Sequence, residues 1–342
     1  MATTYKTLLN DDVVSTRTLL HESIPITGSM VSGTYSDENI KNYSHGRLQS
    51  VYDYPYLSSS ANHIFDLSCG YSADSALSGT VSVVDQNKKI QMYNQLAQVL
   101  VGYDITGSIL KFDEDGDLIG TADDKMNECV FLSFSRLLVK DEIKKNSVRL
   151  VLGNGTYSDP FSTLKTVGDY GANNDYRINS PAGEYGILHS SSVSSAPCGL
   201  VFYQAGIMVL TASVFGDTAQ FLQSGSTDQS VSEALSGSSI QDFADAIRAR
   251  IQDIDFNNTV ELNSTVYFCR INHNEFNYSS NPTYLADSKI RVKDSSVDSP
   301  VSYVTTVGLY SADNELLATA KLSEPLKKTP ENEMILRVRL DY

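Results

Sequence analysis

The chain has no tryptophan, and it has few cysteines and histidines. Its four cysteines lie far apart without any Cys-x-x-Cys pair, and its five histidines are scattered. Structural zinc sites and disulfide frameworks require such residues at short, regular spacings. We therefore expect no cofactor and no metal, and we expect the cysteines to be buried free thiols: Cys69, Cys129, Cys198 and Cys269.

Long apolar stretches are also missing. No segment reaches the ~18 consecutive apolar residues that a membrane-spanning helix needs. The first six residues lack the apolar centre of a signal peptide. The 41 Asp and Glu outnumber the 26 Lys and Arg, and the resulting formal charge of -15 disfavours nucleic acid and anionic membranes as partners. We expect a soluble protein that binds neither.

The motifs of common enzymes do not occur in the sequence. It contains no Gly-x-Ser-x-Gly and no His-Glu-x-x-His motif. The segment Gly153-Asn154-Gly155-Thr156 lacks the Lys-Ser/Thr of a phosphate-binding loop, so we predict a turn there. We predict that the protein is not an enzyme. A glycoside hydrolase stays open as an alternative, because its two catalytic carboxylates follow no sequence motif.

One acidic segment has the spacing of a calcium-binding loop. Asp113, Asp115 and Asp117 alternate along the chain, and Asp124 stands at the twelfth position. An EF-hand loop has glycine at its sixth position and glutamate at its twelfth, whereas this chain has Leu118 and Asp124. The interpretation that we prefer is a solvated acidic turn between hairpin strands.

Apolar residues occur mainly in patterns typical of strands. With 41% apolar and 20% charged residues, the 342-residue chain is globular and long enough for two domains. One hairpin is predicted at 200–203 and 207–212, and another at 302–310 and 316–322. The closing residues 336–342 alternate strictly between apolar and charged side chains, which predicts a final strand with one apolar face.

Two helices interrupt this pattern. Residues 85–101 repeat apolar side chains at helical spacing, and Ser239 begins a second helix as its N-cap. The predicted fold class is therefore α+β and β-rich, with antiparallel sheets, a few packed helices and a C-terminal β-meander or sandwich-like domain. Four parts are predicted along the chain: an N-terminal arm at 1–35, a β-rich body at 36–223, a flexible linker or insertion at 224–238, and a helix with an antiparallel β domain at 239–342.

Tyrosine is unusually frequent, with 20 residues against 12 phenylalanines. Its large ring with a polar end suits surfaces that contact another protein, although tyrosine also fills strand positions in a protein's own core. Two aromatic segments are the candidate contact surfaces. The first contains Tyr52, Tyr54 and Tyr56, and the second contains Phe276, Tyr278 and Tyr284.

Several runs of residues resemble virion structural proteins of tailed bacteriophages, and most closely those of contractile-tailed phages of the marine and cyanobacterial kind. The likeness covers most of the chain but includes no catalytic motif. It lies in Tyr-Val-Thr-Thr-Val-Gly-Leu-Tyr at 303–310, in 314–318, 321–323 and 338–342, and upstream in 50–66 and 200–213.

This resemblance implies a structural role in a phage particle, and the location that it favours is the tail or baseplate. It implies synthesis in the host cytoplasm and a final location in the virion, in its tail or neck. The expected partners are copies of the same chain and other virion structural proteins, joined by apolar burial and strand addition. Two alternatives stay open: a structural protein of the neck or head vertex, and a receptor- or glycan-binding tail module.

Overall fold

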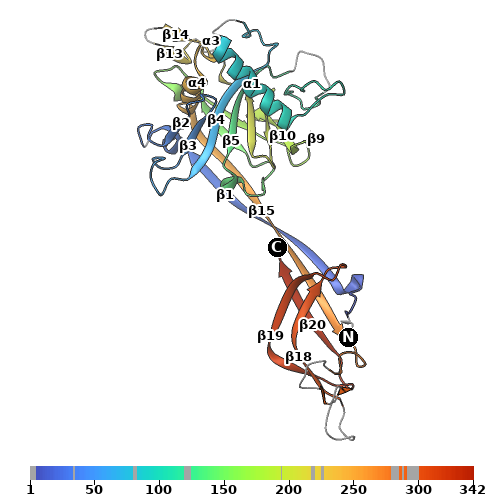
Figure 1. Ribbon diagram of the computed structural model, residues 1–342. Coiled ribbons are helices and arrows are strands. Elements are labelled where there is room, and N and C mark those ends of the chain that lie inside the picture. The colour runs from blue at the N-terminus through green and yellow to red at the C-terminus, as the bar shows by residue number, and fades with distance from the viewer. Residues whose placement is uncertain are drawn as a thin grey trace. The chain divides into compact units, whose positions relative to one another are not determined.

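The computed structural model divides into two compact units, which we describe separately (Figure 1). Unit 1 comprises Met1–Leu19 and Glu261–Tyr342, and unit 2 comprises Leu20–Val260. The division falls within two long strands, β1 (Val13–Thr27) and β15 (Ile251–Ile271), so both strands contribute to both units. The structure describes residues 5–33, 35–79, 83–118, 125–193, 195–216, 220–224, 227–278, 285–286, 289–290 and 300–342.

Unit 2 is built on an antiparallel sheet whose strands follow the order β15-β7-β8-β10-β11-β12-β5-β4-β3-β2. Two short strands pair at its side, β6 with β15 and β9 with β10. The strands are β2 (Ile40–Asn42), β3 (Gln49–Tyr52), β4 (His63–Tyr71), β5 (Glu128–Phe134), β6 (Glu142–Ile143), β7 (Arg149–Gly153), β8 (Leu164–Gly168), β9 (Tyr176–Ser180), β10 (Gly183–Ser190), β11 (Pro197–Phe202) and β12 (Ile207–Thr211).

This sheet is buried on both faces. Along β5, Leu132 and Phe134 belong to one hydrophobic core cluster, whereas Cys129 and Phe131 belong to a second. Successive strand residues point to opposite faces, so the two clusters cover the two sides of the sheet. A strand that is apolar on both faces has a nearly continuous hydrophobic sequence, as β5 has from Cys129 to Leu132.

Helices pack on the sheet. The longest, α1 (Val83–Leu100), packs on β4 (Figure 1). Gly70 of β4 permits this approach, because a Cβ atom there would stand 2.5 Å from the carbonyl oxygen of Lys89. The remaining helices include α2 (Arg136–Val139), α3 (Val231–Gly237) and α4 (Ile240–Arg248), with short 3-10 turns at Asn10–Asp12, Pro160–Ser162 and Ala212–Phe215 and a π turn at Ser29–Gly33.

The predicted fold class is confirmed, since antiparallel strands dominate and a few helices pack on them. The helix predicted at 85–101 is α1, and the helix predicted after Ser239 is α4. The Ser239 hydroxyl oxygen accepts a hydrogen bond from the Asp242 backbone N–H at 3.1 Å, which is the expected N-cap. Both predicted hairpins form, as β11 with β12 and as β18 with β19.

Most of the predicted flexible linker or insertion at 224–238 has regular secondary structure. Its residues form β14 (Thr227–Gln229), which pairs with β13 (Leu222–Ser224), and the helix α3. Ser230 and Glu233 make a capping box, in which the Ser230 N–H donates to the Glu233 carboxylate at 2.8 Å. The many small polar residues of this segment predicted a linker and not a helix. Val231, Ala234 and Leu235 of the helix are nevertheless buried.

The predicted division into parts also differs from the observed one. The N-terminal arm predicted at 1–35 contains the whole of a 15-residue strand, β1, which neighbours β15. Helix α4, expected in the C-terminal domain, belongs to unit 2, where it packs on β4. Pairing between strands more than 200 residues apart, and not local composition, decides these boundaries.

A buried lysine joins two helices of unit 2. Lys89 of α1 is fully buried, and its ammonium group donates to the carbonyl oxygens of Leu235 at 2.6 Å, Ser236 at 3.2 Å and Ser238 at 2.6 Å. These carbonyls lie at the C-terminal end of α3, where helix carbonyls lack partners of their own. Burial lowers the pKa of Lys89, and the three acceptors satisfy its ammonium donors.

A buried carboxylate holds the turn between β6 and β7. Asp169 accepts hydrogen bonds from the backbone N–H of Asn146 at 2.6 Å, from that of Val148 at 2.9 Å and from the Tyr203 hydroxyl at 3.1 Å. Burial raises the pKa of Asp169 to about 6, although these three donors favour its ionised form. Tyr203 is itself fully buried, so the pair is shielded from solvent.

Asp169 should make unit 2 less stable as pH rises. Its folded pKa of about 6 exceeds the ~3.9 of an unfolded aspartate, so folding favours the protonated form. The contribution is complete below pH ~4 and is lost as pH rises to about 6, by up to ~2–3 kcal/mol. Urea unfolding of Asp169→Asn should lack this loss relative to wild type, whereas the exposed control Asp159→Asn should keep it. Parallel pH profiles of wild type and Asp169→Asn would contradict the prediction.

Unit 1 contains two separate β layers. In the first, β20 (Met334–Asp341) pairs antiparallel with the C-terminal part of β15, and β1 neighbours β15 on its other side. The second is the hairpin of β18 (Ser302–Tyr310) and β19 (Leu316–Lys328). A small pair, β16 (Leu285–Ala286) and β17 (Lys289–Ile290), completes the strands that are described.

Candidate interaction surface

Unit 1 buries few of its apolar side chains. Within its described residues, the buried hydrophobic side chains are those of Ile271 and Val301. Neither of the two hydrophobic core clusters includes a residue of this unit. Lys328 is instead fully buried, where its ammonium donates to the His273 carbonyl at 3.1 Å and to Asn277 Oδ1 at 2.8 Å. A unit of this length normally builds an apolar core, and the described residues of this unit do not form a closed one.

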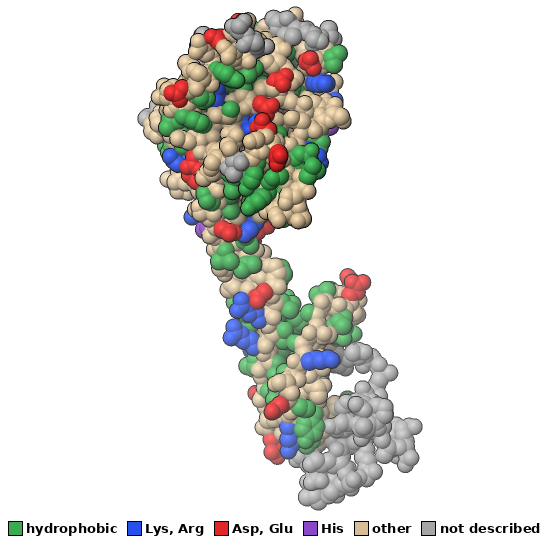
Figure 2. All heavy atoms as spheres, turned by 90° about the vertical axis from the view of Figure 1, so that its left-hand side faces the viewer, with side chains coloured by type: hydrophobic (Ala, Val, Ile, Leu, Met, Phe, Trp, Pro, Cys, Tyr) green, Lys and Arg blue, Asp and Glu red, His purple; other side chains and the backbone are tan. Residues whose placement is uncertain are grey.

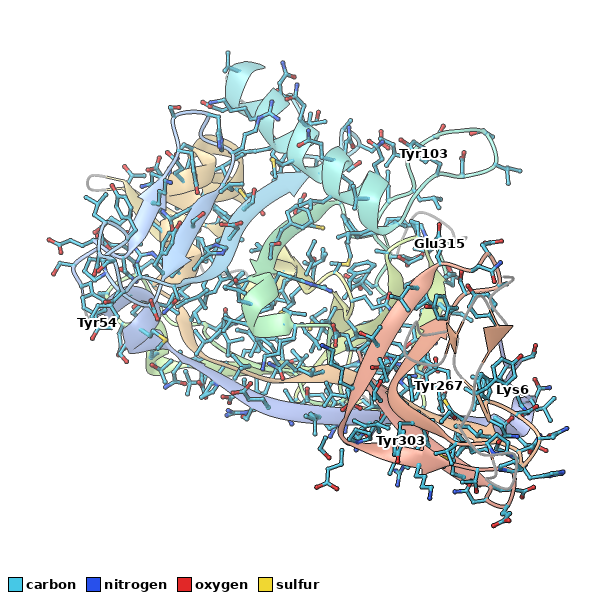
Figure 3. The ribbon with its side chains drawn as sticks, turned by 60° about the horizontal axis from the view of Figure 1, so that its bottom comes forward. Lys6, Tyr54, Tyr103, Tyr267, Tyr303 and Glu315 are labelled. Carbon is cyan, nitrogen blue, oxygen red and sulfur yellow. The ribbon has the colours of Figure 1, made fainter. Side chains whose placement is uncertain are left out.

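An open cleft lies where that core would be. It separates the β15–β20 layer from the β18–β19 hairpin and has a volume of about 660 Å³. Tyr267 faces it from β15 (Figure 3). Both layers and the N-terminal segment line it mainly with apolar side chains, among them Tyr5, Leu8, Tyr267, Ile271, Phe276, Val304, Val307, Leu309, Tyr310, Leu317, Leu336 and Leu340.

The predicted alternation of the last strand is visible in this arrangement. Leu336 and Leu340 of β20 line the cleft, whereas Arg337 and Arg339 lie on the opposite face of the sheet. Cys269 lies opposite Leu336 in the register and also lines the cleft. It is half-buried, so the expectation that all four cysteines are buried is wrong for Cys269 and right for the other three.

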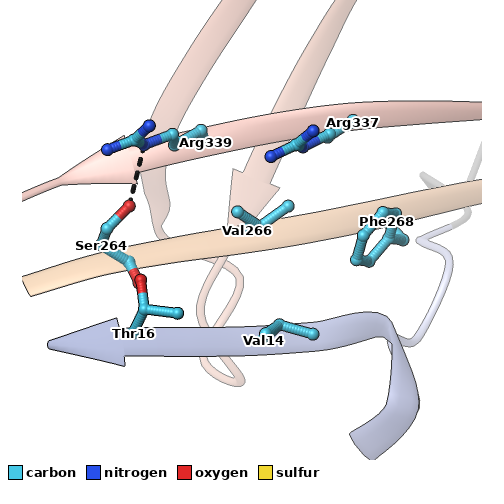
Figure 4. A pocket seen from close by; sticks show the side chains of 7 residues that line it. All are labelled: Val14, Thr16, Ser264, Val266, Phe268, Arg337 and Arg339. Atoms are coloured by element: carbon cyan, nitrogen blue, oxygen red, sulfur yellow. Dashed lines mark hydrogen bonds between the residues drawn. The ribbon is translucent and has the colours of Figure 1, made fainter.

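The opposite face of the same sheet carries a shallow groove of about 270 Å³ (Figure 4). Val14 and Thr16 come from β1, and Ser264, Val266 and Phe268 come from β15. Arg339 Nε donates to the Ser264 hydroxyl at 2.9 Å and to the Asp341 carboxylate at 2.8 Å. Hydrogen bonds from Ser264 and Arg339 hold the pKa of Asp341 below its ordinary value.

Many large apolar side chains of unit 1 therefore remain open to solvent. Hydrophobic side chains, green in Figure 2, are visible on the surface of this unit. The exposed fraction reaches 68% for Leu317, 62% for Ile335 and 54% for Tyr303. Among the described residues of unit 1, the exposed set is Tyr5, Leu9, Val14, Leu19, Leu262, Phe276, Tyr278, Tyr303, Tyr310, Leu316, Leu317, Leu326, Ile335 and Tyr342.

These side chains offer enough area for a specific interface. A large side chain carries ~150–250 Å² of surface, so fourteen that are about half exposed present roughly 1,000 Å² or more. A standard protein interface buries about 800 Å² per partner. Exposed apolar area on this scale marks a surface that contacts another molecule.

Charge is unevenly divided between the two units. Unit 2 contains 28 acidic against 15 basic residues, whereas unit 1 contains 13 against 11. Many charges of unit 1 are paired, as in Lys6–Glu275 at 2.6 Å and Arg270–Asp12 at 2.5 Å. The Lys6 ammonium and the Asn272 N–H hold the pKa of Glu275 below its ordinary value. Unit 1 is thus the nearly neutral part of an acidic chain.

The first predicted aromatic segment forms a cluster on unit 2. The rings of Tyr52 and Tyr56 are 6.3 Å apart, and the ring of Tyr54 lies 5.3 Å from that of Tyr35. Tyr54 and Tyr56 are exposed, at 49% and 37%, whereas Tyr52 is half-buried at the end of β3. Figure 3 shows Tyr54 at the surface of unit 2. These tyrosines form a partly open surface with no cleft described beside them.

The second aromatic segment belongs to unit 1. The Phe276 side chain lines the cleft. The backbone of Phe276 has a positive φ of 52°, and the Ser302 hydroxyl donates to its carbonyl oxygen. Tyr278 is 57% exposed. Tyr284 lies outside the described residues. The structure therefore adds to this segment a larger set of contact candidates on β18, β19 and β20, which the sequence indicated only as strands.

The acidic segment contains one buried carboxylate, that of Asp113, which is paired within the protein. Oxygen atoms of Asp113, Asp115 and Asp117 lie within 4.8 Å of one another, with Asp113 buried and the other two exposed. The Lys125 ammonium forms an ion pair with the Asp113 carboxylate, which also accepts from the Leu118 N–H at 3.1 Å. Asp124, the fourth predicted ligand, lies outside the described residues.

Comparison of the chain with models of protein families, with curated proteins and with solved structures finds no match in any of the three. No helix within the described residues has both the length and the apolar character needed to cross a membrane. A function must therefore be argued from the surfaces described above.

Proposed function

We propose that this protein is a structural component of a tailed bacteriophage particle, placed in the tail or baseplate, where it assembles with copies of itself and with other virion proteins. Unit 2 would supply a rigid, self-contained body, and unit 1 would supply the contacts.

The open core of unit 1 is the observation that carries this proposal. A unit with two buried hydrophobic side chains among its described residues and a cleft of about 660 Å³ gains stability when another polypeptide covers its apolar faces. Large exposed apolar patches on soluble proteins mark sites that contact another molecule. Permanent assemblies use such surfaces as halves of a shared core.

The likeness of 303–310 and 338–342 to phage virion proteins supports the same role, because these runs fall in the strands that expose apolar side chains. The first is most of β18, and the second is the end of β20 with the C-terminal Tyr342. Residues chosen for contact with neighbouring chains would occupy such positions.

The particle itself provides the test. Virions of the phage that encodes the chain would be purified, and the chain would be quantified by mass spectrometry and located by immunogold labelling with an antibody against unit 2. We expect several copies per particle, with gold at the tail or baseplate. A nonsense mutation in the gene should leave heads without functional tails. Particles that lack the chain, or that assemble and infect normally without it, would overturn the proposal.

A further inference from the structure

The last strand of unit 1 has an open edge. Within the described residues, β20 pairs with β15 along one side and with no strand along the other. β20 contains no proline and no bulge against β15, whereas β19 contains Pro325 and two register shifts against β18. Prolines and bulges protect sheet edges from pairing with another chain, and β20 has neither protection.

The hydrogen-bonding direction of each β20 residue follows from one pair of bonds. Tyr342 and Asn263 exchange backbone bonds, with N–H···O distances of 2.8 and 3.0 Å. Antiparallel strands alternate between bonded and non-bonded pairs, so the even-numbered residues of β20 direct their N–H and C=O groups towards β15. The odd-numbered residues Ile335, Arg337, Arg339 and Asp341 direct theirs towards the open edge.

The side chains of β20 fit one antiparallel register with a second copy of themselves. If Leu336 lies opposite Leu336 of the second copy, Ile335 bonds with Arg337 and Glu333 with Arg339, each pair twice by symmetry. Ile335, Arg337 and Arg339 have outward backbone groups, and Glu333 directly precedes β20. The Glu333 and Arg339 side chains bring opposite charges together. Glu333 is 66% exposed, and its described contact is the exposed His273. On the cleft side, Met334 faces Val338, so that face is entirely apolar.

The register with Ile335 opposite itself also pairs Glu333 with Arg337, but it overlaps only residues 334–336 of β20. The registers shifted the other way are less favourable because of their charges. A shift that places Arg337 opposite itself sets like charges against each other and also brings Glu333 opposite Asp341. The next shift places Arg337 opposite Arg339 twice. A shift by a single residue would place the apolar side chains of one copy on the same face of the joined sheet as the charged side chains of the other. Like charges directly opposite across a ladder are destabilising.

We propose that two copies of this chain join along the open edges of β20, antiparallel and with Leu336 at the centre of the pairing. The two sheets then become one, in the order β1-β15-β20-β20-β15-β1. The near-neutral unit 1 is the part of the acidic chain where two copies meet with little repulsion. This inference adds a specific contact to the proposed assembly role. It rests on that role only for the claim that the pairing occurs in a phage particle.

A designed disulfide tests the register. In a Cys269→Ser background, which removes the thiol opposite Leu336, Leu336→Cys should form a disulfide-linked dimer of twice 37.5 kDa on mild oxidation. Opposite non-bonded residues have Cα atoms ~4.5 Å apart, within disulfide range. The matched control Val338→Cys lies opposite Met334 in this register, roughly 13 Å from its symmetry mate, and should stay unlinked. Cross-linking of Val338→Cys, or of neither variant, would overturn the register.

A proline substitution tests the edge itself. Arg337→Pro removes an N–H that points away from β15, so it should spare the β15 pairing and weaken self-association at least about 100-fold by sedimentation. Arg337→Ala keeps that N–H and should change self-association less than about tenfold. Far-UV circular dichroism shows whether Arg337→Pro folds. If it does not, Glu333→Arg should weaken the dimer and Arg339→Glu should restore it. Equal association of the proline and alanine variants, or no rescue, would overturn the proposal.

The two proposals fail separately. A monomeric chain that is nevertheless found in virions leaves the phage role standing and removes the β20 pairing. A β20-linked dimer that is absent from virions keeps the pairing and removes the phage role. Association through β20 with a different protein, and not with a second copy, would also overturn this inference.

Discussion

Arg250→Met should lower the free energy of unfolding of unit 2 by about 3–5 kcal/mol. Arg250 is among the largest fully buried side chains. Its guanidinium donates to the carbonyl oxygens of Gly155 at 2.7 Å, Phe221 at 3.0 Å, and Gly153 and Gln220 at 3.2 Å each. It also lies 4.6 Å above the centre of the Phe221 ring.

The size of this effect follows from the acceptors that the substitution leaves behind. Each buried carbonyl without a donor costs about 1–3 kcal/mol. Burial of the charged guanidinium costs free energy and lowers the pKa of Arg250. The neutral Met side chain avoids this cost, which offsets part of the lost stability. Arg250 ties the turn after β7 to the segment before β13, two segments that no strand pairing joins within the described residues.

Two variants calibrate the measurement. Arg250→Lys keeps a charge but has three donors and no flat group to stack on Phe221, so it should lose about half as much. Arg149→Met removes a guanidinium that is 52% exposed and paired with Asp253 and Asp255, and it should cost less than about 1 kcal/mol. Urea unfolding followed by far-UV circular dichroism gives all three values. An Arg250→Met variant within 1 kcal/mol of wild type would refute this account.

The parts of the fold that the sequence predicted are those set by local patterns. Helix α1 follows from apolar spacing, α4 from its cap at Ser239, and the two hairpins from their turn residues. Helix α3 was predictable in principle, since Ser230 and Glu233 have the capping-box spacing, but its composition of small polar residues resembles a linker. The pairing partners of β1 and β15 were not predictable, because nothing local specifies contacts between residues 240 positions apart.

The candidate surface shows the same limit. Alternation in 336–342 correctly predicted which side chains of β20 share a face. Whether that face is covered depends on how fully the β18–β19 hairpin packs over it, and the open edge depends on which strands pair. Tyr278 and Phe276 were indicated by their aromatic character, whereas Leu317 was predicted only as part of a strand and Ile335 lay outside the predicted final strand. Exposure of apolar side chains is a property of the folded arrangement and leaves little trace in composition.

Hydrogen exchange should separate the two units of the isolated chain by a factor of at least about 10³. Amides of the β18–β19 hairpin should exchange fast, because few of its residues are buried. Amides of β11–β12 should exchange slowly, since nearly every residue of that hairpin is buried between two core clusters. Both elements are antiparallel hairpins and differ strongly in apolar cover, although the β18–β19 ladder has two register shifts and the β11–β12 ladder has none.

The concentration dependence of exchange makes this prediction specific. At nanomolar protein, the outward N–H groups of Ile335, Arg337 and Arg339 have no partner strand and should exchange as fast as the β18–β19 amides. At high concentration, pairing of two copies should protect these three amides while leaving β11–β12 unchanged, and Arg337→Pro should abolish that gain. Equal protection of the two hairpins in the dilute chain would mean that unit 1 is stable without a partner, and its exposed apolar faces would then need another explanation.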